Sequence, residues 1–528
     1  MNDKPLSSHW ADISADTIIR ERGEKEHYVC ASGITPSGTV HIGNFREIIS
    51  VELVVRALRD RGRKVRFIYS WDDYDVFRKV PANMPRQEYL AQYLRQPITC
   101  VPDVLGREES YAARNEKNLE AILPKVGIEP EYIYQASRYR ASHYAEEMKT
   151  ALDKKDTIRQ LLNAHRTAPL PEDWQPLSVF CTQCHRDTTE VKNRDGEYGI
   201  RYECSSCGNT ETVDLRSTGA VKLPWRIDWP MRWHHEKVDF EPAGKDHHTE
   251  GGSFDTARTI AGEVYKCEAP VTFQYEFVRV KGGSGKLSSS SGEVVSLSDV
   301  LRYYQPEVVR YLFAGTRPNT DFAISFDLDI FKIYEDYDKL ERSYFNKPDN
   351  PKKLNKWQKD ARTYELSQIS HIPQTQPAQI QIRHLTVLLQ IHSGNIGKAL
   401  EHINPLAPRD ILKLTKRAEC AWNWVCDFAP EEFRFSLRSP ETPPIPLAPE
   451  LAAAVLQLRH LSEQQLGKIP EKDFSKLMYQ IIQTNQLESA EFFRAVYQLL
   501  IAKDEGPRLI NFLHILGTET VLPLLSPA

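Results

Sequence analysis

The sequence predicts an α/β protein in which a doubly wound parallel sheet is interrupted by a cysteine-bearing insertion and followed by an all-α region. Three observations support this fold class. An apolar strand near the N-terminus leads through a glycine-rich loop into an apolar helix, two Cys-x-x-Cys pairs stand mid-chain, and helical periodicity dominates the last third. We expect four segments: 1–85, the first half of the sheet domain; 86–220, the insertion; 221–335, the second half of the sheet domain with a flap loop; and 336–528, the all-α domain.

Length and composition are those of a soluble multidomain protein. A chain of 528 residues suits roughly two to four domains, and its hydrophobic content of 41% and charged content of 27% are ordinary. The net charge of −4 gives no global sign of a nucleic-acid binder, although a local positive face is enough for that role. The N-terminus lacks a signal-peptide core, and no apolar run approaches the roughly 20 residues that span a bilayer. We therefore expect a cytoplasmic protein without a membrane partner.

The first candidate phosphate loop runs from Ser32 to Asn44. It follows Tyr28–Ala31, a predicted buried strand, and precedes a helix marked by apolar residues from Ile48 to Leu58. Backbone N–H groups and the positive dipole end at a helix start attract anions, and His41 adds a donor for a phosphate oxygen. The alternative is an ordinary glycine turn with a capping histidine. We predict that the chain binds a nucleotide at this loop.

A second strand, Val65–Tyr69, ends in a run that contains Asp72, Asp73 and Asp75. Doubly wound folds place ligands just past the carboxyl ends of parallel strands, so these carboxylates are candidates to hold a cation or a cationic substrate. Helix capping and turn formation are the alternative for each of them.

Two Cys-x-x-Cys pairs predict a zinc-binding insertion. Cys181 and Cys184 are separated from Cys204 and Cys207 by 19 residues, a pattern of tetrahedral zinc sites. Four thiolates leave no open coordination position, so we expect one structural Zn²⁺ and no ligand role for His185. A vestigial or redox pair is the alternative.

A second glycine-rich loop follows the period-2 run Val271–Val278, which predicts a strand. The loop, Lys281–Gly292, combines three glycines between Lys281 and Lys286 with serines that follow Lys286. This composition suits a flap that closes on a triphosphate, and a flexible linker is the alternative. Beyond residue 335 amphipathic helical patterns take over, with a proline-rich linker at 439–446.

His41-Ile42-Gly43-Asn44 and Lys286-Leu287-Ser288-Ser289-Ser290 resemble the two signature sequences of class I aminoacyl-tRNA synthetases, which implies a Rossmann-type sheet. Within that family the chain is similar to the lysine-specific branch over nearly its full length. The matching stretches are 35–47, 224–233, 244–253 and 505–517. The chain departs from the pattern at Asn44, where a second histidine is usual, and at Ser289, where a second lysine is usual. Near Asp103, Arg107 and Glu108 replace the Cys-His pair that a second metal would need.

The resemblance implies ATP-dependent ligation of L-lysine to tRNA(Lys) through lysyl-adenylate, with Mg²⁺ on the nucleotide. The implied catalytic residues are His41, Asn44, Lys286 and Ser288. The implied ATP-binding residues are Pro36, Ser37, Gly38, His41, Gly43, Asn44, Gly244, Asp246, Lys286, Leu287, Ser288, Ser289 and Ser290. The implied lysine-binding residues are Gly33, Thr35, Trp225, His247 and Tyr275, and the zinc ligands are Cys181, Cys184, Cys204 and Cys207. Asp72 and Glu276 are candidates to meet the lysine ammonium.

The resemblance also implies that the C-terminal helices bind the anticodon arm of the tRNA. Two basic clusters are candidates for RNA contact: Lys352, Lys353, Lys356 and Lys359 around Trp357, and Lys413, Lys416 and Arg417. We expect a monomer. The competing functions are a tRNA-independent adenylate-forming ligase and a synthetase-like RNA-binding protein without catalysis.

Overall fold

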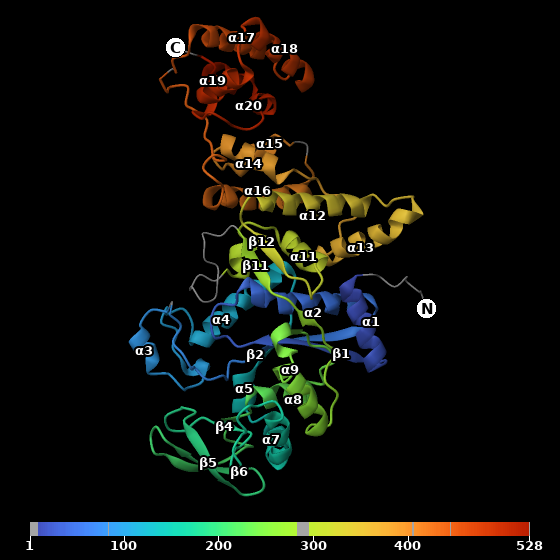
Figure 1. Cartoon of the computed structure of the whole chain (residues 1–528), viewed down its shortest axis with the longest axis vertical. Helices are drawn as coiled ribbons and strands as arrows, with labels where there is room; N and C mark the ends of the chain where they lie inside the picture. Colours follow the sequence, from blue (N-terminus) through green and yellow to red (C-terminus); the bar gives the residue numbers. More distant parts are fainter. Residues whose placement is uncertain (1–8, 83, 282–294, 404–405, 444, 527–528) are drawn as a thin grey trace. The chain divides into compact units, whose positions relative to one another are not determined.

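A computed structural model describes residues 9–82, 84–281, 295–403, 406–443 and 445–526. Its first sheet contains β1 (His27–Ile34), β2 (Lys64–Trp71) and β3 (Glu131–Tyr134), all parallel and in that spatial order. Helix α1 (Trp10–Arg22) precedes β1, and α2 (Ile42–Asp60) connects β1 to β2 (Figure 1). The predicted strand–loop–helix–strand unit is confirmed, and β3 shows that part of the range 86–220 adds to the same sheet.

Parallel pairing continues on the other side of β1. Phe240 bridges to Cys30 and to Val271, both in parallel, and beyond it β9 (Ala243–Gly244) pairs in parallel with β10 (Gln274–Tyr275). Because these segments follow the insertion in sequence, the chain returns to the sheet it left. The doubly wound parallel arrangement that the sequence predicts is therefore present.

Helices cover both faces of this sheet. The packed residues Val29, Ala31, Ile68 and Ile133 meet Trp229 and Trp233 of α8 (Trp225–Glu236) and Phe254 of α9 (Ser253–Glu263). Helix α2 contacts β1 and β2 as well, and its apolar residues from Ile42 to Leu58 are almost entirely buried. A helix that is apolar on most sides is a core helix, which explains the unbroken apolar character of this stretch.

The predicted strand Val271–Val278 is wrong in part, because the chain forms two short strands there. Gln274–Tyr275 is β10, whereas β11 (Val278–Lys281) pairs with β12 (Phe322–Ser325) in another sheet. Between them the Glu276 N–H donates to the Pro318 carbonyl at 2.9 Å, and Arg46 donates to the Phe277 carbonyl. These contacts come from sequence-distant residues and turn the chain from one sheet to the other.

The range 86–220 contains helices and a small antiparallel region. Its helices are α3 (Gln87–Ala91), α4 (Tyr111–Glu120), α5 (Gln135–Arg140), α6 (Ala145–Asp153) and α7 (Lys155–Asn163), with short 3₁₀ turns at Ile98–Cys100 and Leu123–Val126. Strands β5 (Thr189–Arg194), β6 (Gly199–Cys204) and β7 (Thr210–Asp214) form one antiparallel sheet, and β4 (Ser178–Val179) pairs with β8 (Val221–Lys222).

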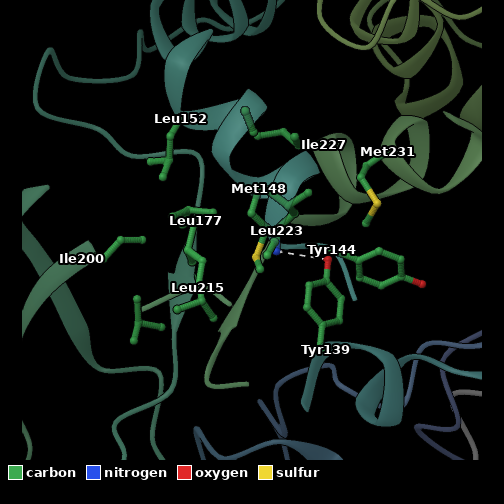
Figure 2. Packing of buried hydrophobic residues seen from close by; sticks show 14 of the residues in the cluster. Tyr139, Tyr144, Met148, Leu152, Leu177, Ile200, Leu215, Leu223, Ile227 and Met231 are labelled. Atoms are coloured by element: carbon green, nitrogen blue, oxygen red, sulfur yellow. Dashed lines mark hydrogen bonds between the residues drawn. The ribbon is translucent and has the colours of Figure 1, made fainter. Parts of the chain in front are cut away.

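This part shares a core with the second half of the sheet domain. Figure 2 shows Met148 and Leu152 of α6 and Ile200 of β6 gathered with Ile227 and Met231 of α8. The buried Tyr139 hydroxyl joins them, since it accepts from the Leu223 N–H at 3.3 Å and donates to Asp228. The insertion is therefore packed onto the second half of the sheet domain and is not a separately tethered module.

Every described element after β12 is helical. These helices are α12 (Asp329–Phe345), α13 (Pro351–Ser367), α14 (Ile382–Ile391), α15 (Ile396–Glu401), α16 (Pro408–Asp427), α17 (Pro449–Gln465), α18 (Glu471–Thr484), α19 (Ser489–Ile501) and α20 (Leu509–Leu524). Two further helices, α10 (Leu297–Val300) and α11 (Pro306–Gly315), precede β12. Helices α17 to α20 share a core that includes Leu458, Phe474, Phe492 and Phe512. The predicted all-helical C-terminal region is confirmed for the described residues.

The chain divides into two compact units. One contains residues 1–301, 306–324 and 340–374, and the other contains 302–305, 325–339 and 375–528. None of the helices within the described ranges is long and apolar enough to cross a membrane.

Candidate active site

His41 is the N-cap of α2 and takes part in a reciprocal capping box. Its Nδ1 accepts from the Asn44 N–H at 3.2 Å, and the Asn44 side-chain oxygen accepts from the His41 N–H at 3.3 Å. Burial lowers the pKa of His41, so the ring is neutral near neutral pH. Because Nδ1 accepts a hydrogen bond, the proton of the neutral ring lies on Nε2. His41 therefore caps the helix, and its Nε2–H is left as a donor; nucleotide binding at this loop stays a prediction.

Gly43 gives the His41 ring its room. A Cβ at this position would lie 2.8 Å from His41 Cε1, closer than side chains approach. The signature glycine is thus required by the histidine two residues before it, which explains their pairing in the sequence.

The loop before His41 is held by α4. Tyr111 donates its hydroxyl to the Ser37 carbonyl at 2.7 Å, and the Asn115 amide donates to the Pro36 carbonyl at 3.0 Å. These bonds tie the loop backbone down from one side. Residues of the insertion therefore support the first phosphate loop.

A cavity of about 750 Å³ opens at the carboxyl ends of β1 and β2. It is lined by most of the predicted nucleotide-binding and lysine-binding residues: Gly33, Thr35, His41, Gly43, Asn44, Trp225, Gly244, Asp246, His247 and Tyr275. Pro36, Ser37 and Gly38 do not line it. The predicted residues Lys286, Leu287, Ser288, Ser289 and Ser290 lie outside the described residues.

Gly33 and Thr35 occupy the end of β1 where the cavity begins. Gly33 pairs with Ser70, and a Cβ on Gly33 would lie 2.7 Å from the Ser70 carbonyl oxygen. Thr35 donates its hydroxyl to Asp75 at 3.0 Å, and Asp75 is in turn paired with the buried Lys222 at 2.6 Å. This arrangement leaves the Gly33 backbone facing the cavity without a side chain.

The three aspartates after β2 are already engaged. Asp72 pairs with Arg232, whose other partners are Asp228 and the Ser70 hydroxyl at 3.1 Å. Burial raises the pKa of Asp72 to about 6 although Arg232 opposes that shift. Asp73 accepts from the Ala136 N–H at 2.7 Å.

Glu276, the other carboxylate predicted to meet the lysine ammonium, pairs with Lys245 at 2.7 Å. Neither Asp72 nor Glu276 therefore offers an unpaired carboxylate.

Glu47 is a cavity-lining carboxylate that sequence reasoning missed. One oxygen accepts from the Ser32 hydroxyl at 2.8 Å and the Gly33 N–H at 3.2 Å, and the other accepts from the Tyr275 hydroxyl at 2.5 Å. All three donors are neutral, and no described lysine or arginine forms an ion pair with Glu47. Burial raises its pKa. Its position three residues after Asn44, on the same face of α2, is the signal that could have revealed it.

A second acid, Glu241, lines the same cavity. It accepts from the Trp233 indole N–H at 2.6 Å, and its pKa is raised to about 7, first by burial and then by the charge of Glu47. Two mutually repelling carboxyls in one cavity form an acidic end that favours a bound cation.

Aromatic side chains form another wall. The Trp225 ring stacks on Trp229 with centroids 4.8 Å apart, and His247 meets Trp229 edge-on at 5.8 Å. The Arg232 guanidinium lies 5.5 Å from the Trp225 ring centroid, so a protein cation already contacts this aromatic surface. Tyr275 contributes its hydroxyl to Glu47, as described above. The three predicted wall residues thus line one cavity.

The four predicted zinc ligands converge. Cys181 Sγ and Cys207 Sγ are 3.6 Å apart, as are Cys184 Sγ and Cys204 Sγ, and all four sulfurs lie within 4.8 Å of one another. Tetrahedral zinc at about 2.3 Å from each sulfur separates neighbouring sulfurs by about 3.8 Å, so the cluster fits zinc. His185 is not part of the cluster.

One predicted RNA contact is wrong. Arg417 is fully buried, and its guanidinium pairs with both oxygens of Asp338, at 2.6 and 2.9 Å. The sequence cluster mixes this core ion pair with Lys413 and Lys416 because a helix places neighbouring residues on different faces.

The chain is similar to known proteins over nearly its full length. The family model described as tRNA synthetases class I (K) matches residues 8–370. A lysine–tRNA ligase of Borreliella burgdorferi is 52% identical over 513 residues, which are 97% of this chain and 98% of the relative. One from Pyrococcus horikoshii is 42% identical over 532 residues, or 98% and 99% of the two chains. A solved glutamate tRNA ligase from Elizabethkingia meningosepticum is 14% identical, with a TM-score of 0.43, and the match covers 95% of this chain and 98% of that one.

Proposed function

Because this chain belongs to the class I (K) family of tRNA synthetases, we propose that it ligates L-lysine to tRNA(Lys) in an ATP-dependent reaction through lysyl-adenylate. The observation that carries the specificity is the acidic end of the cavity, where Glu47 is held by neutral donors only. A lysine side chain supplies an apolar stem and the cationic partner that Glu47 lacks among its described neighbours.

Lysine lies with its two ends in different surroundings in this proposal. Gly33 and Thr35 hold the backbone end, and the rings of Trp225, His247 and Tyr275 pack along the stem. The ammonium donates to Glu47, with Glu241 adding negative potential. The walls of the cavity support this arrangement because all seven residues line it.

The first step needs no general base, since the lysine carboxylate that attacks the α-phosphate is already an anion. Catalysis then consists of positioning and of stabilising charge on the phosphates. His41 Nε2–H and the Asn44 amide donate to phosphate oxygens at the positive end of α2, a helix of 19 residues. Mg²⁺ accompanies the triphosphate as part of the substrate.

The remaining nucleotide contacts rest on the sequence motifs. Pro36, Ser37, Gly38 and Gly43 shape the loop around the phosphates, while Gly244 and Asp246 hold the ribose. Lys286 and Ser288, with Leu287, Ser289 and Ser290, form the flap that meets the departing diphosphate. The activated acyl group then passes to the 2′-hydroxyl of the terminal tRNA ribose.

Each segment of the chain has a separate role in this proposal. Residues 1–85 and 221–335 form the catalytic domain, 86–220 hold a structural Zn²⁺ at the four cysteines, and 336–528 bind the anticodon arm of the tRNA. The closed four-sulfur cluster supports a structural zinc, because such a site has no position for substrate. The chain acts as a monomer in the cytoplasm.

ATP–pyrophosphate exchange with each standard amino acid, with and without tRNA, tests the proposal. We expect exchange with lysine and charging of tRNA(Lys). Background exchange with every amino acid, even when tRNA is present, would contradict enzymatic activity and favour a non-catalytic RNA-binding protein. Exchange with glutamate in place of lysine would overturn the specificity, and lysyl product formed without tRNA would favour the simpler ligase.

A further inference from the structure

Two histidines outside the cavity place their ring nitrogens together. His392 follows α14 and His402 follows α15, and their Nε2 atoms are 2.8 Å apart with ring centroids at 5.0 Å. One ring must donate and the other accept, so the two nitrogens share a single proton. Both rings reach solvent, which leaves the point between them open to an ion.

The turn between the helices holds this pair in place. Gly394 has a φ of +83°, and a Cβ there would lie 2.5 Å from the Trp422 ring, so the turn closes tightly on α16. The Gly394 N–H donates to the Leu389 carbonyl at 2.8 Å, and Asn395 caps α15 by accepting from the Lys398 N–H at 3.0 Å. The paired imidazoles are thus mounted on a fixed hairpin of α14 and α15 (Figure 1).

The electrostatic setting suits a cation. Each histidine stands at the C-terminal end of a helix, where the carbonyl groups are directed outward and favour positive charge. Lys398 opposes a cation and Glu401 favours it, and both belong to α15.

From this geometry we infer that His392 and His402 form a second metal site, which binds a late first-row divalent ion such as Zn²⁺ through the two Nε2 atoms. Imidazole nitrogens are ligands of choice for such ions. Two nitrogens bound tetrahedrally at about 2.0–2.1 Å are separated by about 3.4 Å, so an ion replaces the shared proton after the pair opens by about 0.6 Å. The remaining coordination positions hold water. This site is independent of the proposed function and of the four cysteines.

Equilibrium dialysis against Zn²⁺, followed by metal analysis of the whole chain, tests the inference. We expect the unaltered protein to hold a second zinc ion beyond that of the cysteine cluster. His392→Gln and His402→Gln should each lose that second ion, with affinity at least about tenfold weaker. His460→Gln, a change at another exposed histidine of a C-terminal helix, should keep it.

Cobalt distinguishes the two sites by their spectra. Co²⁺ bound by four thiolates shows intense sulfur-to-metal charge transfer, whereas a site of two imidazoles and water does not. When zinc fills the cysteine cluster, added Co²⁺ should give only weak bands that disappear in His402→Gln. The inference would be overturned if the unaltered chain failed to bind a second ion. It would also be overturned if both histidine variants still bound one. Circular dichroism of both histidine variants, measured with zinc in the cysteine cluster, checks that they are folded.

Discussion

Glu47 and Glu52 lie on the same helix, α2, yet their carboxylates have opposite kinds of neighbours. Glu52 pairs with Arg56 and with the fully buried Arg310, whose Nη2 is 2.6 Å away. Arg310 also donates to the carbonyls of Val126 and Leu366, at 2.8 to 3.1 Å. Glu47 faces the cavity and accepts from neutral groups only.

The difference separates a structural charge from one that we propose binds the substrate. A buried acid that has its own arginine stabilises the fold only as a pair, because the loss of one partner leaves the other charge buried. A buried carboxylate without a cationic partner destabilises the ligand-free protein, and a bound cation offsets that cost by pairing with it. Glu47 is therefore the better marker of the ligand, although Glu52 has the stronger contacts.

The largest expected effect is on the structural glutamate. Glu52→Gln leaves the Arg310 charge buried without its counterion, so we expect the free energy of unfolding to fall by about 3–5 kcal/mol. Denaturant unfolding measures this loss. The lysine dissociation constant of the folded variant should stay near that of the unaltered chain, and a large change in it would break the distinction between the two glutamates.

The complementary change is Glu47→Gln. Removal of the negative charge opposite a buried ammonium costs about 2–5 kcal/mol, so lysine-dependent ATP–pyrophosphate exchange should fall by about 30-fold or more in kcat/KM. The matched control is Glu276→Gln, since Glu276 also lines the cavity but is paired with Lys245. An equal loss in both variants would argue against a specific role for Glu47.

Much of this could be predicted from the sequence, for local reasons. The β1–α2–β2 unit and the cysteine cluster are encoded by short patterns, and both are present as expected. The strand predicted at 271–278 was divided by Pro318 and Arg46, which are distant in sequence. Alternation of side chains cannot reveal a bond that arrives from elsewhere in the chain.

The proposed lysine-binding carboxylate, Glu47, gives only a weak signal in the sequence for the same reason. Glu47 reads as an ordinary helical glutamate, and only the fold brings Ser32 and Tyr275 to its two oxygens. Conversely, Asp72 looked available because its partner Arg232 is 160 residues away. Residue types indicated that a carboxylate meets a cationic substrate. The ion pairs in the folded chain decide which carboxylate has no cationic partner of its own.

A pH dependence of stability sharpens the comparison further. Burial raises the pKa of Glu241 from 4.5 to about 7, so the folded chain favours the neutral carboxyl. A raised carboxyl pKa contributes stability at low pH that is lost as the pH rises toward about 7. Without lysine the Tm should therefore decline over this window. Glu241→Gln should flatten the decline, and an unchanged slope in that variant would contradict the assignment.

The smallest expected effect concerns the support of the phosphate loop. Tyr111→Phe removes one hydrogen bond to the Ser37 carbonyl, worth about 1 kcal/mol, so the KM for ATP should rise by about fivefold. The KM for lysine should change little, because the lysine contacts proposed at Glu47 and the aromatic wall do not involve the loop that Tyr111 holds. Steady-state exchange kinetics with each substrate varied separately measure both constants, and a shift confined to lysine would contradict the role given to this tyrosine.

Titration calorimetry with lysine and norleucine tests the central claim most directly, because norleucine has the same stem without the ammonium. The unaltered chain should bind lysine more tightly than norleucine, and Glu47→Gln should reduce that preference by about 30-fold or more. If the preference for lysine is the same in Glu47→Gln as in the unaltered chain, the ammonium is bound elsewhere and the account is wrong.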